Sequence, residues 1–324
     1  MTEQRLDAWL LSDGHAGNLR QVQALAHAAG WPAQEWIVRT RAPWRWFAPR
    51  IVPGADGAFD DAFSQVLRTA DLRDVVAIGC GRQGALATRL MRERGSRAVQ
   101  ILDPRIDARH WDLVIAPAHD ALRGDNVITL QGSLHPVDDE WLAAGRQAFP
   151  VFGQLPGPRT ALLLGGPSAH ARLDEAFFLQ LARDLCDILH GQGGSLLATA
   201  SRRTPVAPLD TIHGQLASWP GQFWRGEQDG RNPYAGLLGW ADRIVCTAES
   251  VNLLSEAAAT RVPLFVAGID RVAGRPRRFV DALLDSGRAR PFASDLAPYA
   301  VAPLRETPRV AAEVCRRLGM PAPG

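Results

Sequence analysis

The chain of 324 residues contains no lysine, so every strongly basic side chain in it is an arginine. This absence excludes a P-loop lysine, a Schiff-base lysine and the Tyr-x-x-x-Lys pair of short-chain dehydrogenases. Kinases, pyridoxal-phosphate enzymes and the ordinary sugar epimerases are excluded with them. Any bound anion must instead be held by arginine, by backbone N–H groups or by the N-terminus of a helix.

Cysteine, long apolar runs and net charge are also scarce. The four cysteines form no CxxC pair, which favours buried free thiols in a reducing compartment and argues against a zinc site. No apolar run approaches the ~18 residues that a membrane-spanning helix needs, and the first residues lack the basic region of a signal peptide. The net charge of +2 gives no field that would attract nucleic acid. We therefore expect a cytoplasmic protein with no nucleic-acid partner.

What the sequence does contain is an alternation of strands and helices in both halves. Short apolar runs predict strands at 6–12, 34–38, 75–79, 98–102, 112–116, 160–166, 195–199, 242–247 and 262–266. Helical periodicity predicts helices at 18–29, 83–94, 138–148, 173–190, after Thr204, at 252–259 and at 306–317. This alternation predicts an α/β fold with two Rossmann-like domains, each built on a parallel sheet, facing each other across a cleft.

A Pro/Gly-rich stretch at 150–159 is typical of a linker between two domains. We therefore expect a first domain over 1–154, joined by a C-terminal helix within 303–324, and a second domain over 155–302.

The motif SRRTP (201–205) follows the strand at 195–199. Thr204 is a suitable N-cap and Pro205 suits the first position of a helix. Ser201, Arg202 and Arg203 would then stand at a helix N-terminus, which favours an anion such as a diphosphate. The alternative is a solvated turn.

The motif TAES (247–250) repeats this arrangement after the next strand. Ser250 can cap the helix that carries Asn252 and Glu256. Glu256 could accept hydrogen bonds from a ribose diol, or it could be a surface charge.

Two further motifs of the second half admit two interpretations each. Gly165 and Gly166 of GGPS (165–168) either let a ligand approach the backbone or form a tight turn. Asn232 of NPY (232–234) either caps a short helix or contacts a ligand.

The first half offers two histidines at strand ends. His15 lies between glycines in DGHAGN (13–18), where an exposed imidazole can act as a general base. His119 of PAHD (117–120) is a second-rank candidate. Either residue could also be an ordinary polar loop residue.

GCGRQG (79–84) matches the dinucleotide-binding fingerprint after a strand and before a helix. Asp103 follows Gly84 by 19 positions, where that fingerprint places an acidic residue. An NAD-dependent oxidoreductase is therefore a competing hypothesis, although the unit is not the first of the chain and Arg82 adds bulk to the turn.

RAPWRWFAPR (41–50) interleaves three aromatic residues with three arginines. Such a segment, through Trp44 and Trp46, could contact a membrane surface. A Pro-rich loop packed on its own domain is the alternative.

Taken in order, these motifs resemble the mitochondrial-fission (elongated mitochondria) family, whose bacterial members are similar to GT-B glycosyltransferases. The resemblance covers nearly the whole chain through SDGHAGNLRQ, IGCGRQGALA, DPR, WDLVIAPAHD, GGPS, SRRTP, NPY, TAESVNLLSEA and VPLFV. It implies a donor site in the second domain, with no metal or other cofactor required and a nucleoside-diphosphate sugar as donor. This chain departs from the family at one loop, where it has Glu249-Ser250-Val251-Asn252-Leu253 and the family usually has Asp-Ser-x-Ser-Met.

The resemblance also implies roles for individual residues. Donor contacts are expected from Gly165, Gly166, Ser201, Arg202, Arg203, Thr204, Asn232, Tyr234, Thr247, Glu249, Ser250, Asn252 and Glu256. The first-domain side of the cleft is expected to include Asp13, Gly14, Gly17, Asn18, Gln21, Gly79, Gly81 and Arg82. The leading hypothesis is a metal-independent glycosyltransferase acting on an unidentified acceptor. A non-catalytic binding or scaffold protein on the same frame is the other alternative beside the oxidoreductase.

Overall fold

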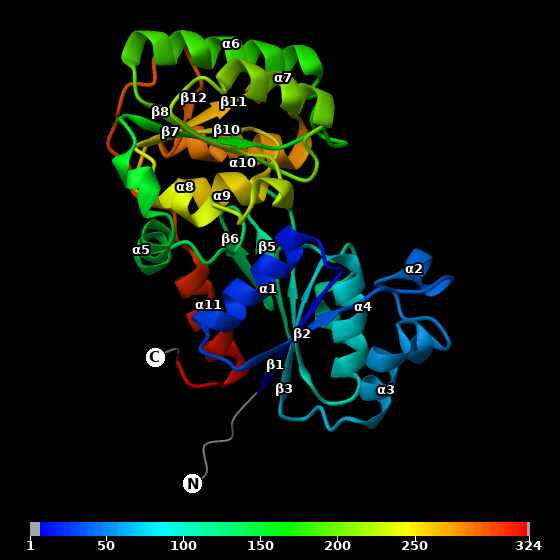
Figure 1. Ribbon diagram of the computed structural model, residues 1–324. Coiled ribbons are helices and arrows are strands. Elements are labelled where there is room, and N and C mark those ends of the chain that lie inside the picture. The colour runs from blue at the N-terminus through cyan, green and yellow to red at the C-terminus, as the bar shows by residue number, and fades with distance from the viewer. Residues whose placement is uncertain (1–6, 323–324) are drawn as a thin grey trace. The chain divides into compact units, whose positions relative to one another are not determined.

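A computed structural model of the protein describes residues 7–322. The chain forms two compact units (Figure 1). The first contains the chain up to Pro136 and returns from Glu306 onward, and the second runs from Val137 to Arg305.

The first unit is built on a six-stranded parallel sheet in the order β2-β1-β3-β4-β5-β6. Its strands are β1 (Asp7–Ser12), β2 (Ala33–Ile37), β3 (Val75–Cys80), β4 (Arg97–Ile101), β5 (Leu113–Pro117) and β6 (Val127–Leu130). Its helices are α1 (Ala16–Ala28), α2 (Trp44–Phe47), α3 (Asp61–Thr69), α4 (Gly81–Arg92) and α11 (Thr307–Leu318).

Helices cover both faces of this sheet (Figure 1). Leu10 packs with α1 and α11 on one face, while its strand neighbours Trp9 and Leu11 pack with α3 and α4 on the other. Successive side chains of a strand point to opposite faces, so a strand with both faces covered must be apolar at nearly every position. This explains why β3 and β5 are continuous apolar runs in the sequence.

The second unit is built on a six-stranded parallel sheet in the order β12-β11-β10-β7-β8-β9. Its strands are β7 (Arg159–Leu164), β8 (Ser195–Ala200), β9 (Gly221–Trp224), β10 (Arg243–Thr247), β11 (Leu264–Ala267) and β12 (Arg290–Pro291). Its helices are α5 (Asp139–Ala148), α6 (Glu175–Gln192), α7 (Val206–Leu216), α8 (Tyr234–Trp240), α9 (Val251–Ala258) and α10 (Gly274–Asp285).

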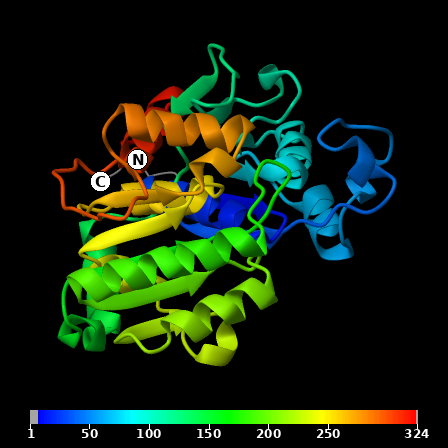
Figure 2. The same ribbon diagram turned by 90° about the horizontal axis from the view of Figure 1, so that it is seen from above.

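In this unit α6 and α7 lie on one face of the sheet and α8, α9 and α10 on the other (Figures 1 and 2). The chain starts in the middle of the sheet at β7, runs outward through β8 and β9, and then crosses to build β10, β11 and β12 on the other side. Right-handed crossovers require the helices to change faces at that reversal. This strand order is the Rossmann order, with the reversal between β7 and β10.

The predicted α/β fold with two parallel-sheet domains is confirmed, and all nine predicted strands are present within a few residues. Three short strands, β6, β9 and β12, and the helices α2, α3 and α10 were not predicted. The helix α10 begins with GRPRR, and the proline in this stretch indicated an interruption and not a helix. Pro276 falls in the first turn of α10, however, where proline is tolerated.

The helix α5 belongs to the second unit, although the sequence placed it in the first domain. Leu142 joins the hydrophobic core of the second unit, and Gly145 packs against α8 so closely that a Cβ there would lie 2.3 Å from the carbonyl oxygen of Ala235. The chain therefore passes between units at 136–137 and 305–306, and the Pro/Gly-rich stretch at 150–159 lies inside the second unit.

We predict that Gly145→Ala lowers the free energy of unfolding by about 1–3 kcal/mol, the usual range for overpacked positions. The reason is that the added methyl would overlap the α8 backbone, which cannot move away as a flexible side chain could. Urea denaturation monitored by circular dichroism measures this change.

Gly214→Ala in α7 is the matched control, because no atom lies within 4 Å of the position of its Cβ. It should raise the free energy of unfolding by about 0.5–1 kcal/mol through the higher helix propensity of alanine. Equal effects of the two substitutions would refute the close α5–α8 packing.

Candidate functional site

Three neighbouring strands of the second sheet bring the predicted donor motifs to one edge. Gly165 and Gly166 follow β7, residues 201–204 follow β8, and residues 247–250 follow β10. β7 and β10 flank the point where the strand order reverses. Ligands of open α/β sheets bind outside the carboxyl ends of the strands at this switch point.

Hydrogen bonds tie the three turns together. The N–H of Gly165 donates to Thr247 Oγ1 at 2.8 Å, and the N–H of Gly166 donates to Glu249 Oε1 at 3.1 Å. The hydroxyl of Thr204 donates to the carbonyl oxygen of Gly165 at 2.8 Å. The edge is thus a single connected structure.

The two glycines make this close approach possible. A Cβ on Gly165 would lie 1.5 Å from Glu249 Oε1, and a Cβ on Gly166 would lie 2.1 Å from the carbonyl oxygen of Arg203. Protein atoms therefore fill the side-chain positions of both glycines. Of the two interpretations of GGPS, the structure favours the tight turn.

Glu249 is the buried charge at the centre of this edge. Its side chain is 0% exposed, and the half-exposed Arg203 places Nη2 3.6 Å from Oε1. Burial raises the pKa of the Glu249 carboxyl, and hydrogen bonds from Thr247 and the Gly166 N–H and the charge of Arg203 oppose that rise. Within residues 7–322, Oε2 accepts no hydrogen bond.

Thr204 does not cap the following helix, as the sequence predicted. It is buried, and its hydroxyl is directed to the carbonyl oxygens of Leu164 and Gly165. The helix α7 begins at Val206 with Pro205 before it and no side-chain cap. The first N–H groups of α7 are consequently not satisfied by a capping side chain.

Arg202 and Arg203 stand in the exposed turn just before that uncapped helix end. Ser201 holds the turn, because its Oγ accepts the N–H of Arg203 at 3.2 Å and contacts Thr204 Oγ1 at 3.2 Å. Two guanidinium groups beside the positive end of a helix dipole form a favourable place for an anion.

The second predicted helix N-terminus is capped as expected. Ser250 precedes α9, and its Oγ accepts the N–H of Leu253 at 3.4 Å. Asn252 lies half-buried in the first turn. The protein itself thus uses part of the hydrogen-bonding capacity of this end, in contrast to α7.

Glu256 is not a surface charge. It is buried inside α9, and the hydroxyl of Tyr234 in α8 donates a hydrogen bond to its carboxylate. A ribose diol would have to compete with Tyr234 for this group.

Asn232 closes the turn before α8. Its Oδ1 accepts the N–H of Tyr234 at 3.0 Å while the residue itself is exposed. This contact stabilises the turn that leads into α8, whose N-cap position is Pro233 and which has no side-chain cap.

The loop after β7 crosses to the loop after β11, which no sequence pattern indicated. Arg172 donates its N–H to the carbonyl oxygen of Arg271 at 3.0 Å, and Ala273 donates to that of His170 at 2.9 Å. Because β10 stands between β7 and β11 in the sheet, the loop passes over the end of β10. This loop helps to explain why the Glu249 side chain is completely buried.

His15 lies at the corresponding edge of the first sheet, in front of α1. Its side chain is 80% exposed, and Nδ1 lies 3.0 Å from Asp13 Oδ1. Asn18 Nδ2 donates to the same oxygen at 3.0 Å, and Cys80 Sγ contacts Asn18 Oδ1 at 3.5 Å. A carboxylate that holds Nδ1–H leaves Nε2 as the nitrogen able to accept a proton.

His119 follows β5, which β3 and β4 separate from β1. Three strand spacings of ~4.8 Å amount to about 14 Å. His15 and His119 therefore cannot form one acid–base pair within this unit.

The turn GCGRQG does not form a phosphate-binding loop. The strand β3 ends at Cys80 and α4 begins at Gly81 with no residue between them. A Cβ on Gly81 would lie 2.7 Å from Asn18 Nδ2, and one on Gly84 would lie 2.5 Å from the carbonyl oxygen of Leu11. Gly79 likewise faces Thr88 and Gln100. Protein atoms occupy the approaches that a dinucleotide would need.

Two residues expected to line the first-domain side of the cleft have internal partners instead. Arg82 donates to the backbone carbonyl oxygens of Trp46 and Ala48. Gln21 is buried within α1 and donates to the carbonyl oxygen of Gly17 at 3.3 Å. Asp13, Gly14 and Asn18 do lie at the carboxyl end of β1, as expected.

A strained turn after β4 was missed by sequence reasoning. Leu102 and Arg105 have φ values of 73° and 65°, the only positive values at non-glycine positions within residues 7–322. Asp103 stabilises the turn by accepting the N–H of Arg105 at 2.8 Å and by pairing with its guanidinium at 3.2 Å. Asp103 is therefore engaged locally, which removes a further support of the dinucleotide hypothesis.

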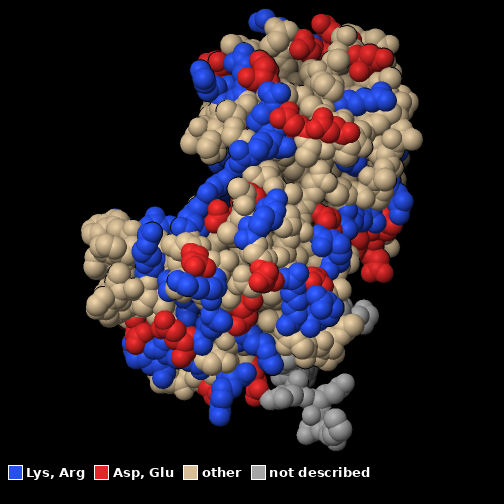
Figure 3. Space-filling view, turned by 180° about the vertical axis from the view of Figure 1, so that it is seen from behind, with Lys and Arg blue, Asp and Glu red and all other residues tan. Residues whose placement is uncertain are grey.

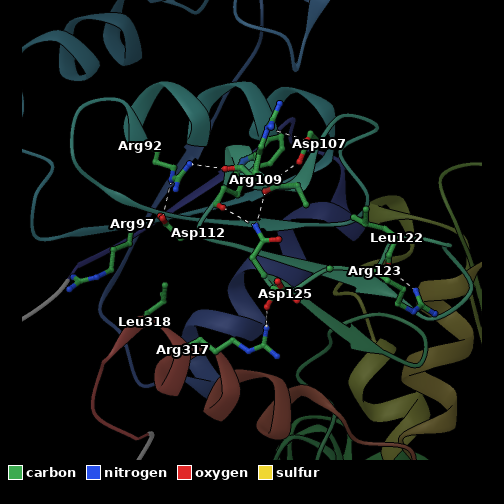
Figure 4. A pocket seen from close by; sticks show the side chains of 14 residues that line it. Arg92, Arg97, Asp107, Arg109, Asp112, Leu122, Arg123, Asp125, Arg317 and Leu318 are labelled. Atoms are coloured by element: carbon green, nitrogen blue, oxygen red, sulfur yellow. Dashed lines mark hydrogen bonds and ion pairs between the residues drawn. The ribbon is translucent and has the colours of Figure 1, made fainter.

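A cavity of about 820 Å³ opens at the amino-terminal ends of β4, β5 and β6, opposite the edge that carries His15. In Figure 4, Arg92 pairs with Asp112 and Arg109 lies beside Asp107, while Arg97 points away. None of the predicted site residues lines this cavity. Arg92 and Arg109 in this cavity already pair with aspartates, so little of their positive charge is left to attract an anion.

Among residues 7–322, no group of three or more His, Cys, Asp or Glu side chains is arranged to hold a metal ion. None of the helices in this range combines the length and the apolar character that spanning a bilayer requires.

Residues 16–318 match the model of a protein family described as Mitochondrial fission ELM1. Among curated proteins, the chain is 30% identical over 275 residues to Mitochondrial fission protein ELM1 of Arabidopsis thaliana, covering 75% of this chain and 64% of that one. It is 26% identical over 201 residues to Uncharacterized protein RP120 of Rickettsia prowazekii (strain Madrid E), covering 60% and 56%. The chain thus spans less than two thirds of the length of either relative.

Solved structures resemble the chain in fold. The S. aureus protein MnaA, solved with UDP, has a TM-score of 0.55 at 10% identity and covers 98% of this chain and 100% of that one. UDP-GlcNAc 2-epimerase of Methanocaldococcus jannaschii has a TM-score of 0.54 at 12% identity and covers 94% and 91%. The two six-stranded parallel sheets are those of the GT-B fold.

The raised pKa of Glu249 implies that the free energy of unfolding depends on pH. A carboxyl whose pKa is raised by folding stabilises the native state below its unfolded pKa of ~4.3 and loses that contribution as pH rises through the folded value. Glu249→Gln carries no titrating group, so its stability relative to wild type should increase as pH rises from about 4. Urea midpoints across this range measure the change, and a pH-independent difference would contradict it.

Glu313→Gln should show the opposite sign. Hydrogen bonds from Arg316 and Arg317 lower the pKa of Glu313 to about 2. The wild type therefore holds its advantage over this variant above the unfolded pKa of ~4.3 and loses it as pH falls toward 2. The advantage should be small, because these ion pairs lie at the protein surface, where solvent screens them.

Proposed function

This chain belongs to the mitochondrial fission ELM1 family, and with that membership as the premise we propose that it is a glycosyltransferase whose second unit binds a nucleoside-diphosphate sugar. The observation that carries the proposal is the uncapped N-terminus of α7 beside Arg202 and Arg203, at the carboxyl end of β8, the neighbour of β7 at the switch point of the sheet. Two of the similar structures were solved with UDP or its sugar, which supports this class of ligand.

The diphosphate is proposed to lie between the turn at 201–204 and the first turn of α7. Arginine forks match phosphate oxygens in two parallel hydrogen bonds, and free N–H groups at a helix end add to them. Both sources of positive charge face a leaving group that gains negative charge as the glycosidic bond breaks. The proposed transfer therefore draws this stabilisation from the protein and needs no metal.

His15 is the proposed general base. Its Nε2 takes the proton of an acceptor hydroxyl as the oxygen attacks the anomeric carbon, while the bond from that carbon to the diphosphate breaks. Asp13 holds Nδ1–H and stabilises the imidazolium that forms, as in other histidine–carboxylate pairs. His119 remains a second candidate at the same edge.

We also propose a peripheral membrane contact for this protein through the Trp44–Trp46 segment. The exposure of aromatic side chains among arginines in this segment supports a lipid-linked acceptor.

We predict that wild type binds UDP and that Arg202→Ala weakens this binding by about ten- to a hundredfold, since a hydrogen bond to a charged group contributes about 1.5–3 kcal/mol. Isothermal titration calorimetry measures both affinities. Arg202→Lys should recover only part of the loss, because an ammonium cannot form the paired contacts of a guanidinium.

Arg261→Ala serves as the control for this titration. Arg261 is an exposed arginine that pairs with Asp139 at 2.8 Å and precedes β11, at the opposite edge of the same sheet. Its removal should leave UDP affinity unchanged. Absence of wild-type binding to UDP and to other nucleoside diphosphates, or equal affinities in Arg202→Ala and Arg261→Ala, would refute the donor site.

We predict that His15→Ala lowers the rate of sugar transfer by about a hundred- to ten-thousandfold, the usual contribution of a general base, and leaves UDP affinity unchanged. Asp13→Asn should lower the rate less, because it retains the imidazole. Release of UDP from labelled donors in the presence of a lipid extract measures the rate. Nucleotide binding without turnover in wild type would instead favour the scaffold hypothesis.

A further inference from the structure

The segment 36–55 carries charge of one sign only. It contains Arg39, Arg41, Arg45 and Arg50, and no acidic residue occurs between Glu35 and Asp56. Within this segment, α2 (Trp44–Phe47) has no buried residue. A short exposed helix in a segment with four arginines and no acidic residue is unusual in a chain whose net charge is only +2.

The two tryptophans of the segment have different roles. Trp44 is structural, because its Nε1 donates to the carbonyl oxygen of Pro53 at 3.1 Å and its ring packs on the core that contains Phe59 and Phe63. Trp46 and Phe47 instead are 62% and 48% exposed. The aromatic pair that faces solvent is therefore Trp46–Phe47, not Trp44–Trp46.

The unit holds this exposed pair in place. Arg82 donates to the carbonyl oxygens of Trp46 and Ala48, and Arg89 Nη1 donates to that of Pro49 at 2.6 Å. The N–H of Arg41 donates to the carbonyl oxygen of Ala58 at 2.7 Å. The aromatic pair is thus presented by a fixed backbone, which reduces the ordering cost of any contact it makes.

Arginines flank the pair in the sequence. Arg45 lies over the ring of Trp46, 5.6 Å from its centroid. Arg39, Arg45 and Arg50 are exposed and form no ion pair with residues 7–322, whereas Arg41 pairs with Asp61. In Figure 3, the projection on the left, which corresponds to the α2 region on the right of Figure 1, is mostly uncharged surface with arginine beside it.

We propose that Trp46 and Phe47 insert into the headgroup region of an anionic lipid bilayer while Arg39, Arg45 and Arg50 bind lipid phosphates. Tryptophan favours the membrane interface, and each arginine near an anionic surface adds to the attraction. A protein partner is less suited, since a stable interface buries roughly 800 Å² on each side, far more than two side chains offer. This lipid contact does not depend on the nucleotide site. It names the residues that would make the peripheral membrane contact proposed above.

Vesicle co-sedimentation tests this inference. Wild type should sediment with vesicles of phosphatidylcholine mixed with phosphatidylglycerol and much less with phosphatidylcholine alone, and high salt should weaken its binding to the mixed vesicles. The double variant Trp46→Ser/Phe47→Ser should bind the mixed vesicles about tenfold or more weakly, given the apolar area removed. Arg45→Ala and Arg50→Ala should each weaken binding about fivefold.

Two controls separate insertion from general effects. Val151→Ser removes a side chain that is 57% exposed in the second unit, and should leave vesicle binding unchanged. Trp44→Phe removes an internal hydrogen bond, and should lower stability while retaining vesicle binding. UDP titration of the Trp46→Ser/Phe47→Ser variant should match wild type, so failure of the lipid contact is distinguishable from failure of the donor site.

Several results would overturn the inference. One is that wild type remains in the supernatant when it is mixed with anionic vesicles. Another is that the double variant sediments as much as wild type does. Equal binding to neutral and anionic vesicles would also contradict it. Wild type that is dimeric by light scattering and becomes monomeric in the double variant would assign the aromatic pair to a second copy of the chain instead.

Discussion

The burial of Glu249 is the constraint on which the second unit's edge depends. Its carboxylate fills the space where a Cβ on Gly165 would lie and accepts the N–H of Gly166, so two strand ends can approach only if both positions are glycine. Thr204 then fastens the third strand end to the first. A carboxyl buried in this way is costly unless it is paired, which accounts for the position of Arg203 and for the raised pKa.

This arrangement determines which groups remain available to a ligand. Thr204 donates to a carbonyl in the neighbouring turn instead of capping α7, so the helix end stays uncapped beside two arginines. In the first unit the equivalent turn is filled by the protein itself: Asn18 lies over Gly81, and Arg82 holds the 46–49 backbone. The same sheet architecture therefore leaves an uncapped helix end beside two arginines in one unit and fills the equivalent turn in the other, where His15 Nδ1 lies 3.0 Å from Asp13 Oδ1.

The sequence predicted the parts of this structure that depend on burial from both sides. Strands such as β3, β7 and β10 are covered on both faces and must be apolar at nearly every position, which is visible as apolar runs in the sequence. Edge strands carry no such signal: β9 is half-exposed and β12 has only two residues, and both were missed. The turn motifs were placed correctly at strand ends, but the partner of each side chain was not predictable. Which acceptor Thr204 chooses, or whether Glu256 meets solvent or Tyr234, depends on neighbours distant in sequence.

The most direct measurement is a crystal structure of the protein grown with UDP. The central claim is that the second unit holds the diphosphate at the carboxyl end of β8, beside the reversal point of its sheet. It predicts density for both phosphates beside Arg202 and the first N–H groups of α7. Phosphate density at the start of α4 in the first unit, or no density at a saturating concentration of UDP, would contradict it.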